Sequence, residues 1–555
     1  MRMRYIALLF TMLLTSHAYA GDARFSFFTY EGQRDERATA QAGAGEYINP
    51  ILSGYAPDPS IVRVGSDYYL VNSSFAHWPG LPIYHSKDLV SWTQIGNAVD
   101  RLSQAQFSGI GVSRGLFAPD ISYHEGTFYI VNTCVDCGGN FVITAQNPAG
   151  PWSNPVWLGF DGIDPSIFWN DDDKAYVLNN GPPDEKPRYD GHRAIWIQAL
   201  NAKTLKLEGP RQQIINGGVD ISKRPVWIEG PHLLKKDGAY YLIAAEGGTA
   251  DQHSEVVFRS RNVTGPFTPY AKNPILTQRD LPAAREHPVT SAGHAKLVQT
   301  QNGDWWAVFL GVRPYAPDRY NIGRETFLLP VTWKDGWPLI LSQGQPVPFV
   351  AKRPNLPAQP APALPTSGDF KYTDELDGQK LSFAWIGIRT PTAPFYALNG
   401  GTLVLKPGAP LGDLKSTPAF IGRRQQHHIA SITTALTYMP DRDGDRSGLA
   451  AVASDEAYLF FGITREQGQT SITLAAPGTT LASAPLRLTS NAPVYLKLSF
   501  NGGSGEAAYA LTQDQWITLK SGFDATLLDT HRSGGFVGTV VGLYNGQNLN
   551  VTSSK

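Results

Sequence analysis

This 555-residue sequence has only two cysteines, almost no net charge and no long apolar run. Two cysteines are too few for a disulfide framework or a four-ligand zinc site. The 47 Lys and Arg residues balance 48 Asp and Glu residues, which argues against a nucleic-acid-binding protein, because such a protein needs a basic surface. No apolar run reaches the roughly 20 residues that cross a bilayer, so we expect no membrane-spanning segment.

Turn-forming and aromatic residues are abundant. The sequence has 55 Gly and 41 Pro residues, aromatic residues make up 11%, and hydrophobic residues make up 42%. A chain with this many apolar residues can build large packed cores. Frequent turns with few helical patterns predict an all-β protein.

The N-terminus has the features of a signal peptide over residues 1–20. Arg2 and Arg4 precede a mostly apolar stretch at 6–14, and the small-x-small sequence at 18–20 is typical of a cleavage site. We therefore expect an exported protein, periplasmic or extracellular.

Composition divides the remaining chain into four parts. Residues 21–45 are polar and rich in alanine and glycine, and we expect a poorly ordered lead-in there. Residues 353–368 contain five prolines, which favour extended chain and predict a linker. This linker separates a large unit at 46–352 from a smaller one at 369–555.

A pattern recurs five times between residues 46 and 350. Each copy has an apolar strand, a polar turn and a second strand that opens with aromatic residues. These aromatic residues are Tyr68 and Tyr69, Phe128 and Tyr129, Tyr176, Tyr240 and Tyr241, and Trp305 and Trp306. Five such hairpins predict a five-bladed β-propeller, in which four-stranded sheets surround a central channel.

Equivalent positions of the five copies should meet at one mouth of this channel. The start of each first strand lies 11 or 12 residues before the last aromatic residue of its copy. These starting positions are Asp58, Ala118, Asp164, Glu229 and His294. Three of the five are carboxylates, although Asp is disfavoured within strands, so the coincidence predicts a functional site.

The three carboxylates lie in the segments APDPS (56–60), GIDPS (162–166) and WIEGPH (227–232). The neighbouring prolines restrict the backbone and so the direction of each side chain. A single Asp-Pro pair is usually a turn, but three carboxylates at equivalent positions suit glycoside hydrolysis, where one carboxyl protonates the leaving oxygen and another activates water. A third carboxylate nearby would raise the pKa of the acid.

These segments resemble those of glycoside hydrolase family 43, whose members are five-bladed propeller enzymes that include β-xylosidases and α-L-arabinofuranosidases. The segments GLPIYHSKDL (80–89) and GRETFL (323–328) match as well. DELD (374–377) and GRRQQHH (422–428) are similar to the β-sandwich appended to the family's xylosidases. The resemblance covers essentially all of 46–555 and implies an all-β chain, a five-bladed β-propeller followed by a concanavalin A-like β-sandwich.

The resemblance also implies an inverting mechanism. Asp58 would be the general base, Glu229 the general acid, and Asp164 the residue that tunes the acid's pKa and orients it. In an inverting enzyme the base and acid carboxyls stand about 6.5–9.5 Å apart, which leaves room for water.

Five further residues match substrate-binding positions of the family. Arg324 would contact sugar hydroxyls and the base, and Phe75 and Phe117 would form the pocket wall, although relatives often have Trp at the second position. Phe536 follows two glycines where a sandwich loop would close one side of the pocket. His294 matches a channel histidine that holds water or, in some relatives, calcium. We expect no metal there, because calcium prefers oxygen ligands.

The resemblance implies an exo-acting enzyme that releases terminal β-D-xylose or α-L-arabinofuranose from hemicellulose such as xylan, arabinoxylan or arabinan. NNGPP (179–183) stands where many xylosidases carry a pocket Trp, so arabinose is at least as well supported as xylose. The alternatives are a non-catalytic sugar-binding propeller and a hydrolase of the same fold for another sugar, such as galactose.

Few other partners are expected. The substrate is an oligosaccharide or polysaccharide; no cofactor is required, and no nucleic acid or membrane takes part. The oligomeric state is not predicted. Cys134 and Cys137 are close enough in sequence for a short disulfide, with a free pair as the alternative. The run of acidic residues at 171–173 lacks the spaced ligands of a calcium loop and predicts a solvated turn.

Overall fold

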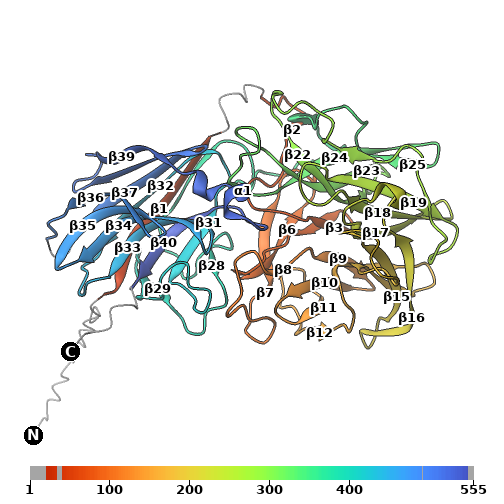
Figure 1. Ribbon diagram of the computed structural model, residues 1–555, viewed down its shortest axis with the longest axis horizontal. Helices are drawn as coiled ribbons and strands as arrows, with labels where there is room; N and C mark the ends of the chain where they lie inside the picture. Colours follow the sequence, from red (N-terminus) through yellow and green to blue (C-terminus); the bar gives the residue numbers. More distant parts are fainter. Residues whose placement is uncertain (1–20, 34–40, 490–491, 548–555) are drawn as a thin grey trace, which may run out of the picture.

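The computed structural model describes residues 21–33, 41–489 and 492–547, and these are almost entirely β-structure. Two units lie side by side, a propeller and a sandwich (Figure 1). The only α-helix among the described residues is the short α1 (Thr530–Ser533), and two 3-10 turns, η1 (Ile221–Lys223) and η2 (Thr526–Leu528), accompany it. None of the described helices could cross a membrane.

The propeller has five antiparallel blades, as the repeats predict. The first contains β3 (Ser60–Val64), β4 (Asp67–Val71), β6 (Gly80–Ser86) and β7 (Thr93–Val99). The second contains β9 (Asp120–His124), β10 (Thr127–Val135), β11 (Gly139–Ala145) and β12 (Val156–Trp157), with β8 (Gly115–Leu116) beside β10. The third contains β13 (Ile163–Trp169), β14 (Ala175–Gly181), β15 (Ala194–Asn201) and β16 (Lys206–Asn216).

The last two blades repeat this arrangement. The fourth contains β17 (Glu229–Lys236), β18 (Ala239–Glu246), β19 (Ser254–Ser260) and β20 (Thr268–Pro269), with β21 (Leu276–Thr277) beside β19. The fifth contains β22 (Thr290–Gln299), β23 (Trp305–Val312), β24 (Glu325–Lys334) and β25 (Trp337–Leu339). The innermost strands β3, β9, β13, β17 and β22 contact their neighbours in a ring, and β22 returns to β3.

The two ends of the propeller chain close this ring. β2 (Glu46–Ile48) pairs with β26 (Val350–Lys352), and Leu52 forms a β-bridge with Thr326 of the fifth blade. The backbone that leads into the first blade is therefore hydrogen-bonded to the last one, which holds the closed form together.

A buried polar network fills the channel between the blades. Asp120, which is 1% exposed, accepts hydrogen bonds from Lys296 of the fifth blade and from Ser60 of the first. The backbone N–H of Ile167 in the third blade also donates to it, and His232 of the fourth lies 3.5 Å away. One carboxylate thus joins all five blades.

The sandwich consists of two eight-stranded sheets packed around one apolar core. One sheet contains β29 (Tyr396–Leu398), β30 (Leu403–Leu405), β1 (Ala23–Gln33), β32 (Ile429–Thr437), β37 (Val494–Asn501), β38 (Ser504–Ala510) and β39 (Ile517–Asp524), with β27 (Phe370–Asp374) beside β1. The other contains β36 (Thr479–Pro485), β35 (Gln469–Ala476), β34 (Ala457–Glu466), β33 (Arg446–Ser454), β40 (Val540–Gly546), β31 (Phe420–Arg424), β28 (Ile386–Ile388) and β5 (His77–Trp78).

The expectation of a poorly ordered lead-in at 21–45 is wrong for residues 23–33. These form β1, which pairs with β32 in the middle of the first sandwich sheet. Phe25, Phe28 and Tyr30 are fully buried, and a shift in register between Phe25 and Phe28 keeps both rings in the core. The averaged composition of 21–45 hides this short aromatic alternation, which stabilises the strand by burying apolar area.

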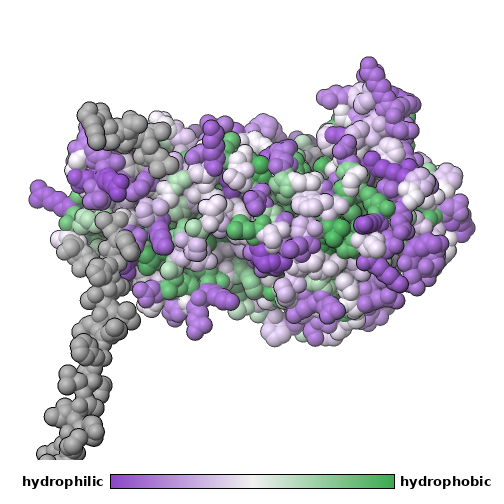
Figure 2. All heavy atoms as spheres, turned by 90° about the horizontal axis from the view of Figure 1, so that it is seen from below, coloured by the Kyte–Doolittle hydropathy of each residue, from purple (hydrophilic) through white to green (hydrophobic). Residues whose placement is uncertain are grey.

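The two units share strands as well as a surface. β5 belongs to the propeller chain but pairs with β28 of the sandwich, and Arg389 donates its backbone N–H to Ala76 O. Between β26 and β27 the described chain forms no helix or strand, and Thr366 O accepts the N–H of Ser53. From below, apolar side chains are exposed near the middle of the molecule, and the outer ends are mainly hydrophilic (Figure 2).

Candidate active site

A pocket of about 590 Å³ opens at one end of the propeller channel. All five repeat positions line it, which confirms that the repeats converge: Asp58, Ala118, Asp164, Glu229 and His294. The other predicted site residues line the same pocket: Phe75, Phe117, Arg324 and Phe536. The residues that line this pocket therefore come from all five blades and from the sandwich.

Irregularities in the innermost strands turn the site residues into the pocket. The β13–β14 register shifts between Ile163 and Ser166, and the β17–β18 register shifts between Glu229 and His232. Each bulge contains a proline, Pro165 or Pro231, which has no N–H to offer to the ladder. A bulge bends its strand and re-aims a side chain, so the prolines seen in the sequence mark the points where the carboxylates leave the sheet.

Three of the site residues have left-handed backbone conformations. The φ angles of Asp58, Asp164 and His294 are 52°, 52° and 51°. Such angles are unfavourable for residues other than glycine and concentrate at functional sites. Next to Glu229, Gly230 has φ +56°, and a Cβ atom there would lie 2.8 Å from His294 Nε2. Only glycine therefore fits beside the channel histidine.

Asp58 is held by hydrogen bonds to both of its oxygens. Arg324 donates from Nη1 to Oδ1 at 2.7 Å and from Nη2 to Oδ2 at 3.3 Å. Ser73 Oγ donates to Oδ2 at 2.5 Å. His294 Nδ1 lies 3.8 Å from Oδ1. These contacts hold the buried carboxylate in a defined orientation.

Asp164 is buried and Glu229 is half-buried, and Asp164 is close enough to raise the pKa of Glu229. Burial, and then the negative charges of Asp164 and Asp58, raise the pKa of Glu229 well above its usual value. Burial also raises the pKa of Asp164 to about 6, against the opposing influence of His294. The site therefore places Glu229, a carboxyl whose pKa is raised, beside the arginine-bound Asp58, the division of roles that an acid–base pair needs.

Aromatic rings form one wall of the pocket. Phe75 stacks on Tyr55 at 5.8 Å and on Phe536 at 5.8 Å, and Phe117 meets Phe75 edge-on at 5.2 Å. Phe536 comes from the sandwich, between α1 and β40, and its backbone is anchored by Tyr55 and Ser113. Such ring faces provide an apolar surface for a sugar.

Sequence reasoning missed several residues of the pocket lining. Trp227, Arg114 and Thr249 also border it. The guanidinium of Arg193 lies 4.0 Å from the ring centre of Trp227. Trp227 stands two residues before Glu229, inside a segment that the sequence analysis singled out, and its position could have been found there. Arg114 and Thr249 lie in no recognisable motif.

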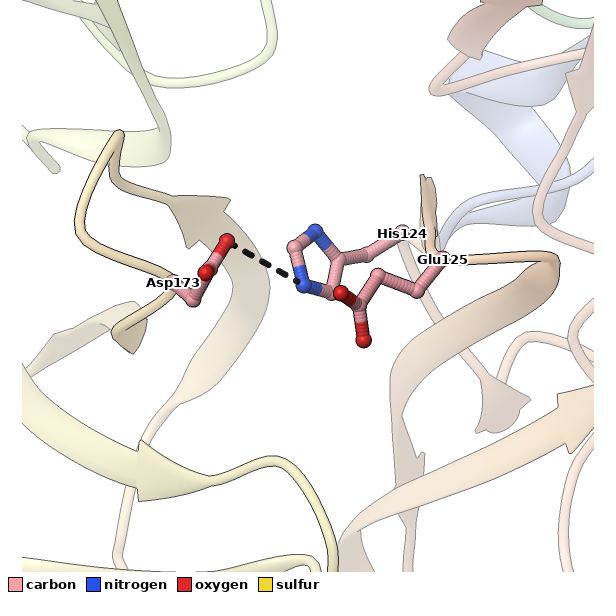
Figure 3. Close-up of side chains that lie close together, drawn as sticks. All are labelled: His124, Glu125 and Asp173. Carbon is pink, nitrogen blue, oxygen red and sulfur yellow. Dashed lines mark ion pairs between the residues drawn. The ribbon is translucent and has the colours of Figure 1, made fainter.

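A cluster of potential metal ligands lies outside the pocket. His124, Glu125 and Asp173 bring their side chains together at the turns after β9 and β13, at the strand ends away from the pocket (Figure 3). His124 Nε2 is 3.9 Å from Asp173, and its ring stacks on Trp169 at 4.1 Å. The side chain of Asp173 is 77% exposed, as expected of a solvated turn.

The two cysteines form a disulfide, Cys134–Cys137, at the end of β10. Of the two alternatives that the sequence left open, the structure has the bonded pair. Its loop is too short to stabilise the fold much.

Comparison with known proteins identifies the family of both units. The model of glycosyl hydrolases family 43 matches residues 47–338, and the beta xylosidase C-terminal concanavalin A-like domain matches 373–555. A xylosidase/arabinosidase from Butyrivibrio fibrisolvens is 38% identical, with 90% of this chain and 96% of that protein covered. A non-reducing end alpha-L-arabinofuranosidase from Bacteroides ovatus is 39% identical over 76% of this chain and 77% of its own length.

Solved structures agree with the fold of both units. A GH43_12 protein from a capybara gut metagenome superposes with a TM-score of 0.87 at 36% identity, over 95% of this chain and all of that one. The xylan beta-1,4-xylosidase from Bacillus halodurans superposes with a TM-score of 0.82 at 32% identity, over 90% of this chain and 97% of that one. With its propeller, its sandwich and its three pocket carboxylates, the chain belongs to glycosyl hydrolase family 43.

Proposed function

We propose that this protein is an exo-acting, inverting glycoside hydrolase that releases terminal α-L-arabinofuranose, β-D-xylose or both from hemicellulose. The observation that carries the proposal is the pairing of an arginine-bound Asp58 with Glu229, whose pKa is raised, in one pocket. The names of the relatives, xylosidase/arabinosidase and alpha-L-arabinofuranosidase, support these pentoses over galactose.

In the proposed reaction, Glu229 gives its proton to the glycosidic oxygen as the bond to the anomeric carbon breaks. A water molecule forms the new bond to that carbon from the opposite face and passes a proton to Asp58. Asp164 keeps Glu229 protonated through its negative charge. Arg324 holds Asp58 in line with the water, and Phe75, Phe117 and Phe536 pack against the sugar. Solvent then removes the proton from Asp58 and returns one to Glu229.

An exo mode follows from the position of Phe536. Its ring closes one side of the pocket, so a long glycan chain has no open groove through the site. A terminal sugar can enter, and the rest of the chain stays outside.

The first test is hydrolysis of p-nitrophenyl α-L-arabinofuranoside and β-D-xylopyranoside by wild type and Asp58→Asn. We expect wild type to release p-nitrophenol from at least one substrate and the variant to lose almost all of that activity. A matched control is Asp161→Asn, which removes an exposed carboxylate. Galactosides belong in the same panel. If the folded wild-type protein hydrolyses none of these glycosides, the result would favour a sugar-binding protein.

The stereochemical course is a second test. Proton NMR of the first sugar released should show the anomer opposite to that of the substrate, before mutarotation mixes the two. Retention of configuration would contradict the role of Asp58 as a base toward water.

The proposed reaction needs no cofactor. A calcium ion at His294 forms no part of it, because imidazole is a poor calcium ligand and the nearby carboxylates are assigned to catalysis. We further propose that the protein is exported, periplasmic or extracellular. The signal peptide predicted at 1–20 lies outside the described residues, and N-terminal sequencing of the secreted protein should find Gly21 first.

A further inference from the structure

A second cavity, separate from the catalytic pocket, lies between the two units. Its volume is about 250 Å³. Its walls come from the first blade, from the proline-rich segment at 362–366 and from the end of β31 in the sandwich. Ser53 and Ala56 line it too, on the stretch of chain that continues to Asp58.

The lining of this cavity carries charge of one sign only. Arg423 and Arg424 contribute to it, and no aspartate or glutamate does. A buried charge without a partner is costly, because its hydration is lost and nothing replaces it. Arg423 is 3% exposed and Arg424 is half-buried, so Arg423 above all needs compensation from other groups.

Neighbouring groups of the protein stabilise the positive charge of Arg423. It is 3% exposed, and its guanidinium lies 5.1 Å from the ring centre of Tyr30, 5.9 Å from that of Phe370 and 5.2 Å from that of Tyr372. Attraction to ring faces stabilises a cation in place of water. Its Nη2 also donates to Gln426 at 3.3 Å, whereas Nε has no partner in the described chain.

Arg424 has no comparable partners. Its Nε is buried without an acceptor among the described residues, and the described chain offers it no carboxylate oxygen within 4.0 Å. Its positive charge acts on Tyr84, which lines the cavity, and on the buried His77. Arg424 lines the cavity, and an arginine guanidinium is a common protein ligand for phosphate, sulfate and carboxylate groups.

We propose that this interdomain cavity is a binding site for a small oxyanion, held by Arg424 with help from Arg423. Tyr84 and Gln426 supply neutral donors at its wall. Phosphate, sulfate and a free carboxylate share the chemistry that the site recognises. Because the walls come from both units, a bound anion joins the propeller to the sandwich and stabilises their packing against heat.

The test is thermal unfolding of the full mature protein in phosphate, sulfate, acetate or glucuronate, against chloride at equal ionic strength. We expect a saturable rise in Tm of about 2 °C or more at an anion concentration near 100 times Kd. Comparison of the four anions distinguishes binding of inorganic oxyanions from binding of carboxylates. Arg424→Gln should abolish the rise. The matched control Arg442→Gln removes an arginine whose side chain is 76% exposed and should keep it.

A crystal soaked in selenate gives an independent readout. Anomalous scattering should place selenium within hydrogen-bonding distance of Arg424 in wild type and not in Arg424→Gln. The proposal is overturned if chloride gives the same rise in Tm, if Arg424→Gln responds like wild type, or if the cavity holds only water. Should Arg424→Gln fail to fold, the selenate experiment on wild type still decides.

Discussion

Arg324 and Asp58 form a two-pronged ion pair across the mouth of the channel, with Nη1–Oδ1 and Nη2–Oδ2 distances of 2.7 and 3.3 Å. The two residues come from opposite ends of the propeller chain, since Asp58 precedes β3 and Arg324 precedes β24. The contact between the first and last blades, which closes the ring, therefore brings Arg324 to the proposed base.

Arg324→Lys should lower kcat/KM about 100-fold, because an ammonium group cannot donate to both oxygens of Asp58 in this geometry. Steady-state kinetics on the better p-nitrophenyl substrate measure the loss. The exchange Arg319→Lys, at a side chain that is 49% exposed, is the control and should change little. Equal losses in both variants would mean that Arg324 acts only on folding.

Asp164→Asn should shift the alkaline limb of the pH–rate profile to lower pH. Glu229 must be protonated to act as the acid, so activity falls as pH rises through its pKa, and Asp164 is one of the charges that raises that pKa. A profile of kcat/KM between pH 4 and pH 9 measures the limb. An unchanged alkaline limb would contradict the assigned role of Asp164.

The same substitution should also change stability with pH. Because the folded-state pKa of Asp164 is raised from 3.8 to about 6, its contribution to stability is fully present below pH 3.8 and is lost as pH rises through 6. Asp164→Asn should therefore be more stable than wild type at pH 8, by on the order of 2 kcal/mol, and the gain should shrink at pH 4. Calorimetry at both pH values measures it, with the exposed Asp161→Asn as control.

Phe536→Ala should raise KM for terminal glycosides roughly tenfold, since a ring that packs against the sugar is lost. It should also open the pocket side that the sandwich closes, so that internal cleavage of longer oligosaccharides rises relative to release of single sugars. Chromatography of the products measures this ratio. Leu511→Ala, at an exposed site in the sandwich, is the control. An unaltered KM and product pattern would remove Phe536 from the site.

Lys296→Met should reduce the free energy of unfolding by about 3–5 kcal/mol, because it leaves the buried Asp120 without its ammonium partner. Denaturant unfolding measures the change. Lys334→Met, on an exposed part of β24, should cost little. Addition of Asp120→Asn to Lys296→Met should recover part of the loss; failure to recover would argue against an uncompensated charge as the cause.

Much of the fold and of the site follows from the sequence because the relevant signals are local. A hairpin with a polar turn and an aromatic pair is complete within a few residues, and five copies predict five blades. The prolines beside Asp164 and Glu229 mark the bulges that aim these two carboxylates. Since the copies are equivalent, symmetry alone predicts that these residues meet.

The sequence by itself determined the repeated blades and the carboxylates at their inner ends. Only the tertiary structure decided that residues 23–33 cross into the sandwich, that Trp227 lies on Arg193 in the pocket wall, and that Arg424 faces an interdomain cavity. Those features depend on contacts between residues far apart in the chain, often several hundred positions, and neither composition nor periodicity carries information about them. The strand at 23–33 and the interdomain cavity form only when both units fold and pack together.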